Sequence, residues 1–164
     1  MLILTASIFA QNGLKVGYVN MNRAINQSDE GKRSKKFLEA QFDQSKRSLD
    51  VKKQTIIAKE KELNESLMLS EEAKSEKRRE VERLKEELRE EAKKEQDSFR
   101  KDEQRHTTKI FEDLLSVVKK ISEREKYDLI LEYNVSQTIL YSRFEFNDIT
   151  DEVIQEYNKL QALK

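Results

Sequence analysis

The sequence has no cysteine, no proline and no tryptophan, and only three of its 164 residues are glycine. Without cysteine there can be no disulfide, thiolate nucleophile or sulfur-ligated metal site. A chain without thiols is also compatible with an oxidising compartment. Because proline and glycine are the residues that most often interrupt helices, their scarcity predicts long continuous helices.

Hydrophobic residues are also scarce. They make up 36% of the sequence, aromatics included, whereas charged residues make up 39%. A globular domain usually has about 45–50% apolar residues, so this chain has too few for one round core. Low hydrophobicity can indicate disorder. Dense mixed charge without proline instead favours long helices with a narrow apolar stripe and one small packed end.

Neither sign of charge is in excess, because 32 basic residues balance 32 acidic ones. Proteins that bind nucleic acid through counterion release carry a basic excess. The sequence therefore predicts no nucleic-acid partner.

The N-terminus begins with a short apolar run, Leu2–Ala10, which has small residues near its end. This pattern is typical of the end of a signal-peptide hydrophobic region, with cleavage after Ala10. The alternative is a buried first strand. A membrane-spanning helix needs about 20 apolar residues, far more than this run offers. We expect residues 1–10 to be a signal-peptide remnant and the rest of the chain to be exported.

The first of two long predicted helices covers about residues 32–69. Four apolar residues in it recur at intervals of seven: Phe42, Leu49, Ile56 and Leu63. This spacing keeps one narrow seam facing one partner helix.

The partner helix is predicted over about residues 71–126. Ser70 is a suitable N-cap, and Glu71 and Glu72 favour the positive end of a helix, so the chain should reverse here. Between Ala92 and Ile110 the apolar stripe nearly vanishes, and Phe99 is the one apolar residue there. Residues 32–109 are therefore expected to form an antiparallel helical hairpin, a coiled-coil tentacle.

Strands are predicted near both ends of the chain. Residues 16–21 are rich in β-branched and aromatic residues, and apolar residues recur at every second position from Tyr127 to Tyr133. Residues 134–137 suit a turn and Thr138–Tyr141 a second strand, which together predict a β-hairpin. A last helix should begin at Thr150. The predicted fold is α+β, mostly α, with a β-rich body from residues 16–31 and 110–160.

Both ends also carry a resemblance. The segment KVGYVNMNRAINQSDEGK (Lys15–Lys32) resembles the N-terminal strand and first helix of the Skp/OmpH-type periplasmic chaperones. The segment YDLILEYNVSQTILYSRFEFNDITDEVIQEYN (Tyr127–Asn158) resembles their C-terminal hairpin and the start of the helix that follows. The resemblance covers essentially the whole chain after residue 10.

This resemblance implies a non-enzymatic, ATP-independent holdase of the periplasm. It implies a homotrimer in which strands of three protomers form a small β body and unfolded outer-membrane proteins are held between the hairpins. Members of the family are often strongly basic, whereas this chain is neutral. We therefore do not extend binding of lipopolysaccharide or of the membrane surface to it.

Two sets of residues are candidates for these contacts. Apolar side chains on a sheet too small to close are expected at the trimer interface: Val16, Tyr18, Leu129, Ile130, Leu131, Ile139 and Leu140. Residues at the hairpin tip or isolated in the charged hairpin are expected to contact clients: Met68, Leu69 and Phe99. The alternative for the second set is packing within their own helical pair.

No catalytic or cofactor site is predicted. His106 is the sole histidine, and Asp102 lies four residues before it, but a solvated helix position explains both. The neighbouring glutamates at 86–87 and 90–91 lie among lysines and arginines, not in a sheltered pocket. The three glycines stand apart and form no phosphate loop. We expect no cofactor and no metal.

Two alternative functions are compatible with this pattern. A structural coiled-coil scaffold would share the helical periodicity but would not need strands at both ends. A cytoplasmic prefoldin-like chaperone would combine helical hairpins with strands but would not begin with an apolar run of the signal-peptide type.

Overall fold

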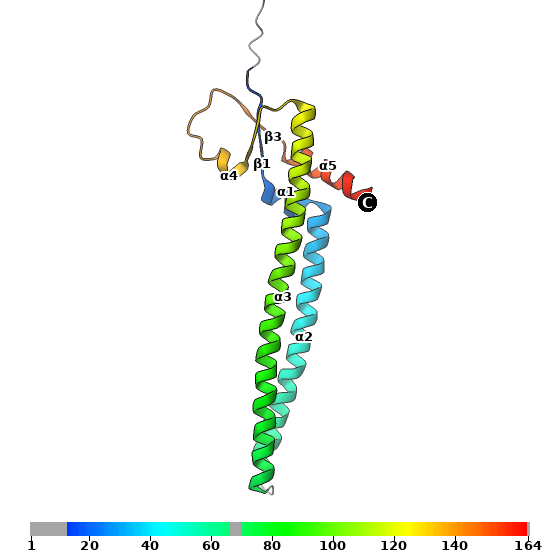
Figure 1. The fold of residues 1–164 in the computed structure, drawn as a ribbon, viewed down its shortest axis with the longest axis vertical. Coiled ribbons are helices and arrows are strands. Elements are labelled where there is room, and N and C mark those ends of the chain that lie inside the picture. Colours follow the sequence, from blue (N-terminus) through cyan, green and yellow to red (C-terminus); the bar gives the residue numbers. More distant parts are fainter. Residues whose placement is uncertain (1–12, 66–69, 164) are drawn as a thin grey trace, which may run out of the picture. The chain divides into compact units, whose positions relative to one another are not determined.

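A computed structural model describes residues 13–65 and 70–163 (Figure 1). The elements are β1 (Val16–Val19), α1 (Met21–Gln27), α2 (Asp29–Glu65), α3 (Glu71–Glu125), β2 (Leu129–Glu132), α4 (Tyr133–Ser136), β3 (Phe146–Asp148) and α5 (Thr150–Ala162). The chain divides into two compact units. We call Arg33–Thr108 the helical hairpin, and Met1–Lys32 with Lys109–Lys164 the body.

In the helical hairpin, α2 and α3 lie side by side and antiparallel (Figure 1). The 37 residues of α2 extend over about 55 Å at 1.5 Å per residue. The Ser70 hydroxyl caps α3 by accepting a hydrogen bond from the Ala73 N–H at 3.2 Å. The predicted pair of long antiparallel helices and its N-cap are therefore confirmed.

The seam of this hairpin is narrow. Among its described residues only Ser34, Ile56 and Val81 are buried. Helices in proteins gain most of their stability from burying an apolar face. With so little apolar burial, the hairpin depends more than usual on helix propensity and on side-chain pairs along its surface.

The body contains a three-stranded sheet in the order β2-β1-β3, in which β1 is parallel to both neighbours. The predicted C-terminal β-hairpin is wrong. Thr138–Tyr141 forms no strand, residues 133–136 form the short helix α4, and the third strand is Phe146–Asp148. β2 and β3 lie on opposite sides of β1, so a tight turn cannot join them, and α4 and the loop after it carry the chain from one edge of the sheet to the other. The predicted α+β, mostly α fold class is confirmed.

One face of the sheet packs on the hydrophobic core of the body. Val19 belongs to this core and Ile130 packs against it. The core is completed by residues of α1, α3 and α5, among them Ala24, Leu114, Ile121, Val153 and Tyr157. Since alternate strand residues point to opposite faces, Val16, Tyr18, Leu129 and Leu131 share the other face.

The junction between α1 and α2 requires glycine. A Cβ atom at Gly31 would lie 1.7 Å from the carbonyl oxygen of Ile25, which no other residue could accommodate without moving the backbone. The Gly31 N–H instead donates to the Ser28 hydroxyl at 3.1 Å. Gly31 thus allows α2 to begin directly against the end of α1.

Candidate functional surfaces

Two aromatic residues meet across the helical hairpin. The rings of Phe42 on α2 and Phe99 on α3 lie 5.7 Å apart at an interplanar angle of 62°, an edge-to-face arrangement. Phe99 is partly buried, whereas Phe42 remains 54% exposed although it lies on the predicted seam. Phe99 therefore bridges the two helices, and its contact with a client stays a prediction.

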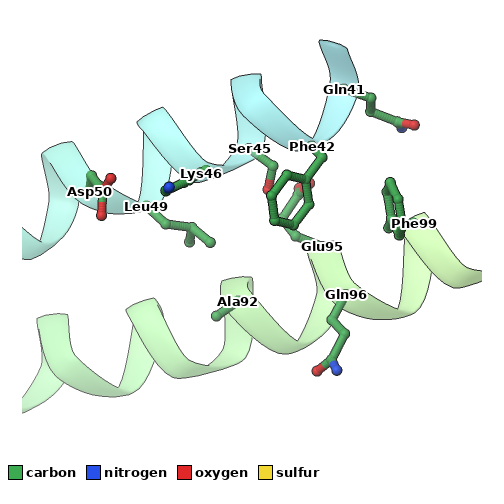
Figure 2. Close-up of a pocket in the computed structure, with 10 residues that line it drawn as sticks. All are labelled: Gln41, Phe42, Ser45, Lys46, Leu49, Asp50, Ala92, Glu95, Gln96 and Phe99. Carbon is green, nitrogen blue, oxygen red and sulfur yellow. The ribbon is translucent and has the colours of Figure 1, made fainter. Parts of the chain in front are cut away.

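Beside this pair is a groove of about 400 Å³ between α2 and α3. Its lining is Gln41, Phe42, Ser45, Lys46, Leu49, Asp50, Ala92, Glu95, Gln96 and Phe99 (Figure 2). Leu49 and Phe42 come from one helix, and Ala92 and Phe99 from the other. The short side chain of Ala92 leaves the space beside Leu49 unfilled. The groove is therefore an apolar recess within an otherwise charged hairpin.

Four polar residues of the groove lining have unpaired side chains within the described part of the chain, whereas Gln41 donates to Asp102. Lys46, Asp50, Glu95 and Gln96 form no side-chain hydrogen bond or ion pair with any other residue in the described part of the chain. Their charges and amide groups are therefore not engaged within the hairpin.

Farther along the hairpin, the charged residues pair across the two helices. Lys59 Nζ lies 2.7 Å from Glu80 Oε1, and Lys85 Nζ lies 2.8 Å from Glu60 Oε1. The hydrogen bond and charge of Lys59 lower the pKa of Glu80. Hydrogen bonds to Glu60 and Glu82 raise the pKa of Lys85. The four side chains are only partly buried, so water screens both pairs and each contributes modestly to stability.

Near the end of the hairpin unit, Ser34 Oγ lies 3.1 Å from His106 Nδ1, and the Phe37 ring lies 5.6 Å from the imidazole. Asp102 pairs with Arg105 and accepts a hydrogen bond from Gln41 at 3.1 Å. His106 and Asp102 thus form contacts between and along the helices. The described residues contain no group of three or more potential metal-binding side chains.

The predicted trimer-interface residues differ in exposure. Within one chain Val16 is already buried, Ile130 packs on the core, and the Tyr18 ring lies 5.5 Å from that of Tyr133. Leu131 is half-buried. Three members are exposed: Leu129, Ile139 and, completely, Leu140.

A family model described as "Outer membrane protein (OmpH-like)" matches residues 15–157. The chain belongs to the OmpH-like family. The resemblance at the two ends of the sequence is thereby confirmed. The fold agrees as well: the crystal structure of a candidate outer membrane chaperone (OmpH-like) from Caulobacter crescentus CB15 superposes with a TM-score of 0.81. That likeness covers 96% of this chain and 92% of the other at 15% identity, which shows a shared fold. Comparison with curated proteins gives no match.

Part of the exposed apolar surface of this OmpH-like protein was not predicted from its sequence. Val135 and Tyr141 are exposed in the segment that follows β2, alongside Ile139 and Leu140. The β-forming residues Thr138–Tyr141 are evident in the sequence, but they were predicted to form a paired strand. Apolar side chains in a segment without a strand partner are the signal that could have identified this surface.

Three sequence-based predictions for the OmpH-like chain lie outside the described residues. They are the client contacts of Met68 and Leu69 and the signal-peptide remnant at residues 1–10. No helix within the described part of the chain is long and apolar enough to cross a bilayer.

Proposed function

We propose that this OmpH-like protein is an ATP-independent periplasmic holdase that binds unfolded outer-membrane proteins and prevents their aggregation. Membership of the family is the observation that carries the proposal. The apolar run at residues 1–10, with its pattern of a signal peptide, supports export to the periplasm.

The surface chemistry of the helical hairpin is consistent with this role. An unfolded barrel protein exposes apolar side chains and unpaired strand edges, both of which promote aggregation. The hairpin exposes large apolar side chains among many charges, among them Phe42, Val51 and Ile57. Scattered apolar contacts are individually weak, and several acting together would retain a client through avidity. The surrounding charges would keep the loaded complex in solution.

We further propose that the protein acts as a homotrimer assembled through the exposed apolar residues of the body. Leu129, Ile139 and Leu140 are candidates for this contact, and Tyr141 adds to them. Burying one large apolar side chain contributes about 1.5–3 kcal/mol, so covering several of them would favour association. Three copies would present three hairpins to one client and multiply the weak contacts.

The proposal is tested by aggregation of a defined client. A urea-unfolded outer-membrane barrel protein is diluted into buffer with the purified chain, with an equal mass of serum albumin, or with neither, and turbidity is followed. We expect suppression by the chain alone, unchanged by adding ATP. Equal turbidity with the chain and with albumin would refute a holdase, and a requirement for ATP would refute the proposed mechanism.

A further inference from the structure

We propose that the groove between α2 and α3 receives one large apolar side chain, preferably aromatic, from a client whose backbone is extended. The inference rests on the proposed holdase function and assigns a defined binding site within it. The groove is the one formed beside Phe42 and Phe99, with Leu49 and Ala92 between the helices (Figure 2).

The groove exists because the apolar seam is incomplete at this level. Elsewhere in the hairpin Ile56 and Val81 are buried, which shows that the two helices can enclose an apolar side chain. Around Ala92 they do not, and Phe42 is left 54% exposed. An apolar side chain inserted here would remove both its own surface and that of Phe42 from water, which is favourable in proportion to the area covered.

The size of the groove limits the occupant. A volume of about 400 Å³ is at the lower end of the range for small-ligand pockets. It can hold one large side chain with the adjoining backbone. A helix, with a diameter of about 10–12 Å including its side chains, is too wide to enter such a recess.

The polar residues of the lining favour a polypeptide. Lys46 is a donor, Asp50 and Glu95 are acceptors, and Gln96 is both. They lack partners in the described part of the chain. An unfolded backbone carries N–H and C=O groups that need both kinds of partner. One cation beside two anions also gives no preference for an anionic ligand, so the apolar floor determines what binds.

The first experiment fills the groove without removing any contact. Ala92→Leu places a larger side chain beside Leu49, and Ala58→Leu makes the same change at an exposed position of α2 away from the groove. Leucine and alanine are both good helix formers, so both variants should remain helical. The probes are fluorescently labelled 12-residue peptides rich in serine and threonine that differ only at one central residue: Phe, Ser or Lys.

We expect the wild type and Ala58→Leu to bind the Phe peptide about five-fold more tightly than the Ser peptide, as partial burial of one ring would give. In Ala92→Leu this ratio should fall to about one. No preference for Phe in the wild type, an equal preference in Ala92→Leu, or tighter binding of the Lys peptide would each overturn the proposal.

The second experiment does not depend on the fold of Ala92→Leu. Phe42 and Phe37 both lie on α2 and are both 54% exposed, but only Phe42 lines the groove. Phe42→Ala should lose most of the preference for the Phe peptide, and Phe37→Ala should keep it. Equal loss in the two variants would overturn the proposal, because it would indicate general apolar adhesion.

Two further readouts separate this inference from its alternatives. If the groove instead holds a second copy of this chain, Ala92→Leu will lower the oligomeric mass in light scattering, which would overturn the proposal. In the turbidity assay, failure of the wild type would refute the holdase function itself. The groove alone would be refuted if the wild type and Ala92→Leu both suppressed turbidity fully and Ala92→Leu also kept its preference for the Phe peptide. The holdase function would then still stand.

Discussion

The side-chain hydroxyl of Thr150 accepts a hydrogen bond at 3.0 Å from the backbone N–H of Asn20, 130 positions earlier in the sequence. Thr150 begins α5 and is completely buried. Asn20 is the N-cap of α1, and its side chain accepts from the Arg23 N–H at 2.8 Å. One hydroxyl therefore joins the starts of two helices from opposite ends of the chain.

Thr150→Val should destabilise the body by about 1–3 kcal/mol, because the shape is retained but the partly buried Asn20 N–H loses its partner. Thr150→Ser keeps the hydroxyl and should cost less. The measurement is urea unfolding at one fixed protein concentration, since association would otherwise shift the midpoint. Equal costs for valine, which lacks only the hydroxyl, and for serine, which lacks only the methyl, would show that this hydrogen bond contributes no more than the methyl group and would contradict the prediction.

Lys126 offers a substitution that should stabilise the body instead of destabilising it. It follows α3 and has a positive φ of 56°, a conformation that favours glycine at the end of a helix. The Tyr127 N–H donates to the Ser122 carbonyl at 3.0 Å, which closes the last turn. Lys126→Gly should stabilise the body by roughly 1 kcal/mol. Lys120→Gly, within α3, should destabilise it by about the same amount. Thermal unfolding of the two variants beside the wild type gives the sign of each change in stability.

The helices were predictable because their signals are local. The seven-residue spacing of Phe42, Leu49, Ile56 and Leu63, and the cap at Ser70, depend on neighbouring residues alone. The packing within that seam was not predictable. Ile56 is buried whereas Phe42 is half-exposed, although the two share the same predicted seam.

The third strand was not predictable, because its pairing is not local. Residues 138–141 have high β propensity yet form no ladder, whereas Phe146–Asp148, with low propensity, pairs with β1. The N–H of Ile149 donates to the Tyr18 carbonyl at 3.0 Å, immediately before α5 begins. Tertiary contacts at the start of α5 thus place β3, and the preceding loop remains exposed. The groove beside Ala92 was missed for a similar reason: it requires knowing which residues face each other.

Asp148 should make stability depend on acid pH. Burial alone would raise the pKa of its carboxyl, but hydrogen bonds from Thr150 and the charge of Arg23 outweigh burial and lower the pKa below its usual range. The Thr150 N–H donates at 2.8 Å, and Arg23 Nη1 lies 3.8 Å away. A lowered folded-state pKa gives stability that is present above about pH 4 and lost as the pH falls through the folded pKa.

Asp148→Asn keeps the acceptor oxygen but removes the titration. We expect its free energy of unfolding to fall less steeply below pH 4 than that of the wild type. Asp43→Asn, an exposed position in the helical hairpin, should retain the wild-type slope. Parallel acid profiles for Asp148→Asn and the wild type would show that this carboxyl does not contribute.

Assembly is tested at an exposed side chain. Leu140 is completely exposed in one chain, so Leu140→Asp should leave the fold of the body unchanged. If the residue lies in the proposed trimer interface, the variant should be smaller than the wild type in light scattering at micromolar concentration. Leu163→Asp, at a leucine that is 84% exposed, is the matched control and should keep the wild-type mass. Ile130→Asp is unsuitable, because Ile130 packs on the core of its own chain. A monomeric wild type would refute the trimer.

Salt separates the two forces that could hold a client. The chain has no net charge, so it has no strong long-range field to attract a charged client. Electrostatic reach is about 8 Å at physiological ionic strength and shorter at higher salt, whereas apolar contacts do not weaken with added salt. We therefore expect suppression of client turbidity to persist at about 0.5 M NaCl. Sodium chloride should also change helicity little, because water already screens the partly exposed ion pairs of the hairpin. Loss of suppression at high salt, with helicity and mass unchanged, would show that charge pairs rather than the exposed apolar side chains retain the client.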